Sequence, residues 1–130
     1  MRKLIFLALT GIAMCFNIAQ AQNNHNKVYD FVSVQKQPAY PGGIEKFYAF
    51  IKREFKYRET DNKNKYEGKV FASFIVEKNG SLTDIRIIKS ISPETDAEAL
   101  RLLKTSPKWE PALLHGTAVR VRYHINFKMV

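Results

Sequence analysis

The chain has 130 residues, enough for one domain, with 21 basic and 12 acidic residues and a net charge of +9 at neutral pH. That surplus favours anionic partners such as nucleic acid, lipid headgroups, envelope polymers or acidic protein segments. The single cysteine, Cys15, lies in an N-terminal leader. The sequence after the leader therefore excludes disulfides, a thiol nucleophile and thiolate metal sites.

Residues 1–21 have the pattern of a secretory signal peptide. A basic N-terminus precedes an apolar run over residues 4–16, and Ala-Gln-Ala at 19–21 is the small-x-small sequence after which signal peptidase cleaves. We therefore expect a periplasmic mature protein that begins at Gln22. Two alternatives remain open, an uncleaved membrane anchor and a lipoprotein acylated at Cys15.

A flexible lead and a first helix are expected next. Residues 22–36 begin with a polar, Asn-rich stretch that should be loosely held, and continue with apolar residues that can form a short strand. Gln-Pro-Ala-Tyr-Pro-Gly-Gly at 37–43 predicts an extended segment and a turn, and it opens the folded domain, residues 37–130. The polar residues 58–66 predict an exposed loop. Between these segments, apolar residues at steps of three and four predict an amphipathic helix: Ile44, Phe47, Tyr48, Ile51 and Phe55.

A β-hairpin is predicted over residues 68–88. Its first strand, 70–77, is rich in β-branched and aromatic residues, and its second strand spans 82–88. Lys-Asn-Gly-Ser at 78–81 supplies the turn, because the Asn-Gly pair tolerates positive φ.

The second helix follows the hairpin. Pro93 precedes Thr95 and Glu98, which stand at the spacing of a capping box. Pro107 ends the helix, and Trp109 is expected to pack across the junction of helix and sheet. The predicted buried side of the helix consists of Ala99, Leu100, Leu102 and Leu103.

A turn at 115–117 leads into a last strand over 118–129, in which apolar and polar residues alternate. The polar residues should face solvent, and the helices should cover the apolar ones: Val119, Val121, Tyr123, Ile125 and Phe127. Together the elements predict an α+β fold. It is a two-layer sandwich in which a small antiparallel sheet of three or more strands carries two helices on one face.

The sequence offers no set of residues typical of an enzyme. Its three histidines, His25, His115 and His124, fall on separate elements, so no pair of them has the spacing of metal ligands. No serine lies in a nucleophile elbow, and no glycine-rich phosphate loop is present. We therefore predict a non-enzymatic protein without cofactor or metal.

A basic platform is predicted on the outward face of the sheet, formed by Arg86, Lys89, Arg120, Arg122 and Lys128. An RNA-binding sheet also needs exposed aromatic rings for base stacking, whereas the aromatic residues of the last strand alternate onto the buried face. Nucleic acid is therefore not a predicted partner. Peptidoglycan or another anionic wall polymer remains open, with the protein as a structural module of the cell wall.

Several short motifs follow one another along the predicted elements. They are Pro-Gly-Gly at 41–43, Gly-Lys-Val at 68–70, Glu-Lys-Asn-Gly at 77–80, Glu-Ala-Leu at 98–100, Pro-Lys-Trp-Glu-Pro at 107–111, and a glycine turn before Val-Arg-Val at 119–121. No single motif is specific, but the ordered set resembles the C-terminal domain of TonB, an envelope protein that docks onto outer-membrane receptors.

The resemblance implies a periplasmic binding module of TonB-dependent transport. Such a module would pair by strand addition, through its last strand, with the receptor's docking peptide, the TonB box. The sequence Gln-Pro-Ala-Tyr-Pro at 37–41 matches the family's Gln-Pro-x-Tyr-Pro motif, while Tyr57 falls where the family's tyrosine usually lies. A homodimer that exchanges strands remains open. The contact residues implied by the resemblance are Gln37, Pro38, Tyr40, Tyr57, Val119, Arg120, Val121, Arg122 and Tyr123.

Overall fold

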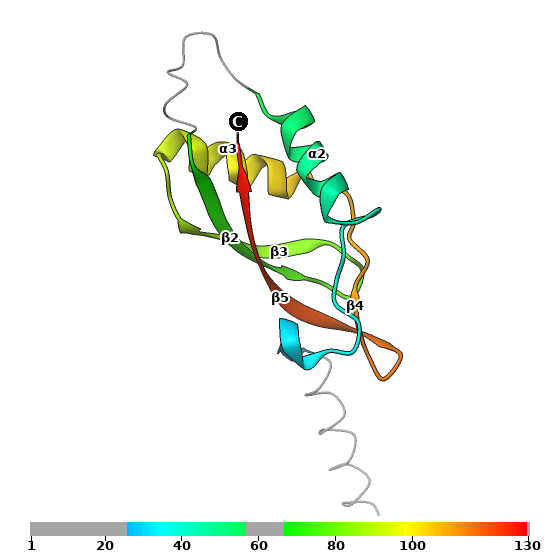
Figure 1. Ribbon diagram of the computed structural model, residues 1–130. Coiled ribbons are helices and arrows are strands. Elements are labelled where there is room, and N and C mark those ends of the chain that lie inside the picture. Colours follow the sequence, from blue (N-terminus) through cyan, green and yellow to red (C-terminus); the bar gives the residue numbers. More distant parts are fainter. Residues whose placement is uncertain (1–25, 57–66, 130) are drawn as a thin grey trace, which may run out of the picture.

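The computed structural model describes residues 26–56 and 67–129. It has two α-helices and a five-stranded sheet with the order β1-β5-β2-β3, in which β4 pairs with β5 beside this path (Figure 1). The leader, Tyr57 and the predicted loop at 58–66 lie outside the described residues. The elements are β1 (Val28–Asp30), the 3-10 turn η1 (Phe31–Ser33), α2 (Ile44–Glu54), β2 (Lys69–Val76), β3 (Leu82–Lys89), α3 (Pro93–Lys104), β4 (Ala112–Leu114) and β5 (Thr117–Lys128).

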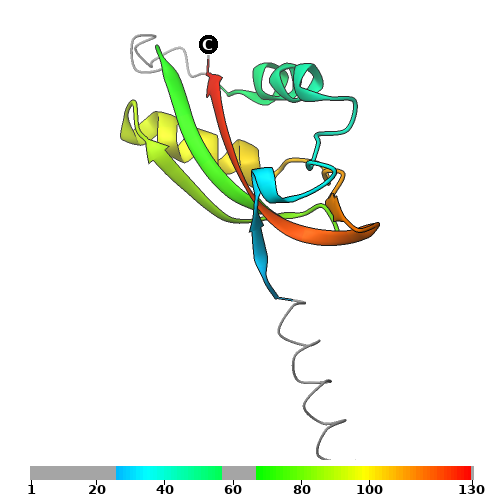
Figure 2. The ribbon, with the colours of Figure 1, turned by 60° about the horizontal axis from the view of Figure 1, so that its bottom comes forward.

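The predicted α+β class is confirmed, with both helices packed on one face of the sheet. Residues of both helices share one hydrophobic core with alternate residues of β2 and β5. The core includes Phe47 and Ile51 from α2, Leu102 and Leu103 from α3, and, from the sheet, Val70, Ala72, Phe74, Val76, Ile125 and Phe127. Figure 2 shows both helices on the same side of the twisted strands.

The hairpin of β2 and β3 forms as predicted, with its turn at Glu77–Ser81. Glu77 N–H donates to the Ser81 carbonyl at 2.9 Å, and Gly80 N–H donates to the Glu77 carbonyl at 2.8 Å. Gly80 has a φ of 85°, whereas Asn79 is not among the described residues with positive φ. Asn79 instead contributes its side-chain oxygen, which accepts from Ser81 N–H at 3.0 Å.

The alternation predicted for the last strand is confirmed in β5. Val121, Ile125 and Phe127 are buried, while His124 and Asn126 are exposed on the opposite face. β5 runs antiparallel to β2 along the whole of β2, with register pairs from Lys69↔Lys128 to Val76↔Val121. Ile125 and Phe127 thus belong to the core that the helices cover, with Tyr123 packed against it, whereas Val121 is buried outside that core and Val119 is only half-buried.

Two short strands add to the predicted antiparallel sheet. β1 pairs in parallel with β5, from Val28↔Arg120 to Asp30↔Arg122, so the complete sheet is mixed. β4 forms an antiparallel hairpin with the start of β5 through the turn at His115 and Gly116. The sequence allowed a short strand in the segment of β1 but did not indicate its parallel partner, and β4 carries too few residues for a detectable period.

The cap of α3 differs from the predicted capping box. The N-cap residue is Ser92, whose side-chain oxygen accepts from Thr95 N–H at 3.1 Å. Thr95 lies inside the first turn and is fully buried, and Glu98 pairs with Arg101 on the helix surface. A helix that begins at Pro93 places a serine directly before the proline, and both positions suit a helix start.

α2 buries a stripe rotated from the predicted one. Phe47 and Ile51 are buried as predicted, and Phe50 joins them. Ile44 is 38% exposed and Tyr48 is 41% exposed, so both flank the core. The helix carries apolar residues on more than one face, and periodicity alone does not decide which face packs inward.

Candidate functional site

The pairing of β5 leaves part of one of its edges open. On one side β2 pairs with residues 121–128, and on the other side β1 covers residues 120–122. Within residues 26–56 and 67–129, no strand pairs with the second edge of the segment 123–128. α2 lies on this side of β5, away from β2 (Figures 1 and 2). An open edge presents unpaired N–H and C=O groups to an extended peptide, here over about 20 Å of strand.

The main chain at the start of β5 is already used within the fold. Val119 pairs with Ala112 of β4, Arg120 pairs with Val28 of β1, and residues 121 and 122 lie between β1 and β2. Of the implied contact residues, Val119 pairs with β4, and Arg120, Val121 and Arg122 pair with β1. Tyr123 is the one that lies in the segment that β1 leaves unpaired. Val121 is also fully buried, which leaves its side chain no access to a partner.

The Gln-Pro-x-Tyr-Pro motif is built into the domain. Ala39 and Glu110 exchange main-chain hydrogen bonds of 3.1 and 2.7 Å, which hold the motif beside the start of β4. Pro38 is buried, and Tyr40 is 7% exposed. The Tyr40 ring packs among Phe47, Phe50 and Trp109, and burial raises the pKa of its hydroxyl. Tyr40 is thus a core residue in this structure, while Gln37 remains exposed.

A groove lies between α2 and the end of β5. Its volume is about 430 Å³, within the range of ligand pockets in proteins. Its apolar part includes Phe127 and Met129, each 2% exposed, beside the half-exposed Tyr48. Sequence analysis missed this feature because its walls come from segments far apart in the chain. Its lining residues are Tyr48 and Lys52 of α2, Lys69 of β2, and Asn126, Phe127, Lys128 and Met129.

Most of the predicted basic platform is neutralised by carboxylates. Arg122 donates to Ser73 Oγ at 3.1 Å and pairs with Asp84, which also pairs with Arg86 at 2.9 Å. Hydrogen bonds first from Arg122 and then from Arg86 hold the pKa of the Asp84 carboxyl below its usual value. The arginines therefore connect β5, β2 and β3 across the outer face instead of forming a free cationic surface.

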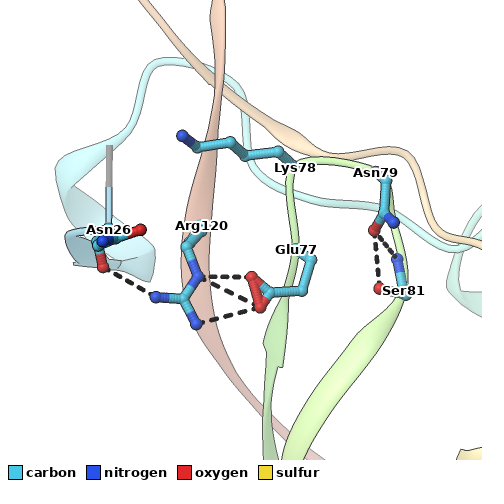
Figure 3. A pocket seen from close by; sticks show the side chains of 6 residues that line it. All are labelled: Asn26, Glu77, Lys78, Asn79, Ser81 and Arg120. Atoms are coloured by element: carbon cyan, nitrogen blue, oxygen red, sulfur yellow. Dashed lines mark hydrogen bonds and ion pairs between the residues drawn. The ribbon is translucent and has the colours of Figure 1, made fainter. Parts of the chain in front are cut away.

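Arg120 performs a similar role at the start of β5. Figure 3 shows its guanidinium between the Glu77 carboxylate and the Asn26 carbonyl, in an open pocket of about 520 Å³. Its Nη2 lies 3.1 Å from Glu77 Oε2, and Nη1 donates to the Asn26 carbonyl at 2.8 Å. Asn79 and Ser81, which also line the pocket, are hydrogen-bonded to each other. Arg120 thus links the residues before β1 and the β2–β3 turn to β5.

Acid should weaken this junction. The hydrogen bond from Arg120 is the main cause that lowers the pKa of the Glu77 carboxyl. The stability from this shift is present above the unfolded-state pKa, about 4.3, and is lost as the pH falls through the lower folded-state pKa. We expect wild type to lose more stability than Glu77→Gln between pH 5 and pH 3 in urea titrations. Equal losses would show that the pair contributes nothing.

Residues 26–56 and 67–129 contain neither a candidate metal site nor a candidate membrane-spanning helix. No group of three or more His, Cys, Asp or Glu side chains in these residues could hold a metal ion. No helix among them is both long enough and apolar enough to cross a membrane.

The comparison with protein families gives one match. The family model described as Gram-negative bacterial TonB protein C-terminal matches residues 53–129, from the end of α2 through β5. The match includes the open edge of β5 and most of the groove, but neither β1 nor the Gln37 motif. Among curated proteins, none matches the chain.

Proposed function

Because the chain belongs to the family of Gram-negative bacterial TonB protein C-terminal domains, we propose that it binds the TonB box of an outer-membrane receptor. The family is a non-catalytic protein-interaction and energy-transducing family that acts in TonB-dependent transport. The bound peptide adds as a strand to the open edge of β5, over residues 123–128.

The observation that carries this proposal is the partial cover of β5. β1 pairs with β5 only as far as Asp30↔Arg122, after which the chain leaves the sheet as η1. The Phe31 ring of η1 packs edge-on against the Tyr123 ring, with centroids 5.3 Å apart. η1 therefore lies at the point where the β1 pairing ends and the open edge begins. A peptide strand could therefore continue the sheet directly after β1, with its main-chain groups satisfied by β5.

Backbone-modified peptides test strand addition directly. We expect a synthetic receptor N-terminal peptide to bind the full chain in a fluorescence polarisation assay. N-methylation of alternate amides removes the donors that face one side of the peptide strand. One alternating set should weaken binding about tenfold or more, since several hydrogen bonds of about 1 kcal/mol each are lost. The other set leaves those donors intact and serves as the matched control. Equal affinities of the two methylated peptides would contradict strand addition.

A wall-associated structural module is the alternative, and its expected behaviour with salt is different. Binding of the basic sheet face to peptidoglycan or another anionic polymer should collapse as salt rises, whereas main-chain pairing should persist. The ion pairs of Arg86, Arg120 and Arg122 with Glu77 and Asp84 argue against a free cationic face. Gln37 remains a proposed partner contact, because it is exposed next to the Ala39–Glu110 bridge.

We further propose that the chain works in the periplasm after removal of residues 1–21. The expected product begins at Gln22, and intact-mass measurement on periplasmic extract identifies it. The double variant Ala19→Leu, Ala21→Leu serves as the control. It should block cleavage, because signal peptidase needs small residues at these two positions. A membrane-bound species that retains Met1, or one that begins with acylated Cys15, would contradict this proposal.

A further inference from the structure

The groove between α2 and the end of β5 differs in charge from the part of the sheet surface where arginines pair with carboxylates. Its three charged lining residues, Lys52, Lys69 and Lys128, are all basic. No ion pair joins any of the three to a described carboxylate, whereas the outward arginines Arg86, Arg120 and Arg122 are all paired. Among the described residues, these three lysines therefore form a basic group that no ion pair neutralises.

Two of these lysines occupy an unfavourable position in the sheet. Lys69 and Lys128 are direct register partners on β2 and β5. Like charges opposite each other in an antiparallel pair destabilise the sheet. A carboxylate bound between them would relieve this repulsion, so the groove is complementary to an acidic ligand.

The apolar part of the groove adds a second requirement. Phe127 and Met129 are nearly inaccessible, but Tyr48 beside them is 41% exposed at a position that its helical spacing would allow to be buried. An apolar side chain in the groove would cover Tyr48 and gain about 25 cal/mol for each Å² of apolar surface removed from water. A ligand suited to the whole groove thus combines a carboxylate with a neighbouring apolar side chain.

The groove lies where the open edge of β5 ends. A peptide paired along residues 123–128 would have one end at Lys128, which lines the groove. We infer that the peptide bound to β5 carries an acidic residue next to a large apolar residue at this end, and that the groove selects peptides by this pair. The inference rests on the proposed strand addition and names the class of peptide that the site prefers.

Short synthetic peptides test this selectivity with the full chain. The probes are acetylated and amidated octapeptides of alternating Val and Ser, with Glu-Leu at either the N-terminal or the C-terminal end. For at least one of the two ends, Glu-Leu should bind about tenfold more tightly than Gln-Leu at low salt, as expected for two or three lysine contacts. The preference should shrink as salt screens the charges.

Substitutions in the protein locate the preference. Lys52→Gln combined with Lys128→Gln should abolish the preference for Glu over Gln, and this coupling identifies the contact. Lys46→Gln is the matched control, because Lys46 is exposed on the same helix but does not line the groove. Tyr48→Ser should reduce the preference for Glu-Leu over Glu-Gly by about fivefold, in line with the loss of apolar contact.

The outcomes separate this inference from the proposed function. Equal binding of Glu-Leu and Gln-Leu peptides at both ends would overturn the selectivity while strand addition stands. An equal loss of preference in Lys46→Gln would overturn it as well, because the effect would then be one of overall charge. If alternate N-methylation changes no affinity, the strand addition itself fails, and the inference fails with it.

Discussion

Replacing Gly80 by alanine should destabilise the protein by about 3 kcal/mol or more. Gly80 has a φ of 85°, which costs any residue with a Cβ. In addition, a Cβ at this position would lie 2.0 Å from the carbonyl oxygen of Trp109, a backbone atom that cannot move as a flexible side chain does. Trp109 N–H also donates to the Gly80 carbonyl at 2.8 Å, so separating the two segments would break a hydrogen bond. Urea denaturation measures the loss.

Gly116→Ala is the matched control for this prediction. Gly116 has a φ of 76°, but an added Cβ there would meet no atom within 4 Å. Alanine at this site should therefore cost only the backbone strain, about 1 kcal/mol. The difference between the two variants isolates the contact of the hairpin turn with Trp109. If the two variants lose equal stability, the turn and the Trp109 segment can separate at little cost.

The hairpin and β5 could be predicted because their signals are local. Strand propensity, an Asn-Gly turn and strict alternation each depend on neighbouring residues, and alternation also decides which face is buried. The same local reasoning placed Pro107 after the helix and Trp109 at the junction, and Trp109 is indeed buried at 3% exposure. Because the helices cover only one face of the sheet, buried and exposed residues alternate along a strand, and this alternation can be recognised in the sequence.

The pairing of β1 and the position of Tyr40 depend on contacts between distant segments. Residues 28–30 and 120–122 are far apart in the chain, and nothing local in Val-Tyr-Asp indicates a parallel partner. Tyr40 sits in a proline-rich stretch that by itself predicts only an extended, exposed segment. Its burial follows from the bridge between Ala39 and Glu110, which turns the ring toward Phe47 and Trp109.

The candidate site shows the same division. The resemblance pointed to the last strand, and the structure limits the usable edge to the part that neither β1 nor β4 covers. The groove could not be predicted, because it needs the position of α2 relative to β5 and an exposed Tyr48. Whether a strand has an unpaired edge depends on its neighbours in the assembled sheet, so it cannot be predicted from the sequence of that strand alone.

Trp109→Ala should cost on the order of 3 kcal/mol of stability. The indole packs edge-on against rings from the sheet, from α2 and from the segment before it, so its loss would open a cavity at the centre of the domain. The ring centroids lie 5.2 Å from Tyr123, 5.3 Å from Phe74, 5.6 Å from Phe47 and 5.8 Å from Tyr40. Thermal and urea unfolding measure the loss.

Two comparisons show whether packing is the cause. Ser106→Ala removes the acceptor of the Trp109 Nε1 hydrogen bond, which measures 3.0 Å, together with the bond that the hydroxyl donates to the Pro107 carbonyl. It keeps the indole in place and should cost about 1 kcal/mol. Trp109→Phe keeps an aromatic ring, so its loss of stability should lie between those of Ser106→Ala and Trp109→Ala. In the folded wild type, tryptophan fluorescence should resist quenching by iodide, because the side chain is shielded from solvent. Free quenching, or a loss in Trp109→Ala no larger than in Ser106→Ala, would place Trp109 at the surface and make it a candidate partner contact instead of a core residue.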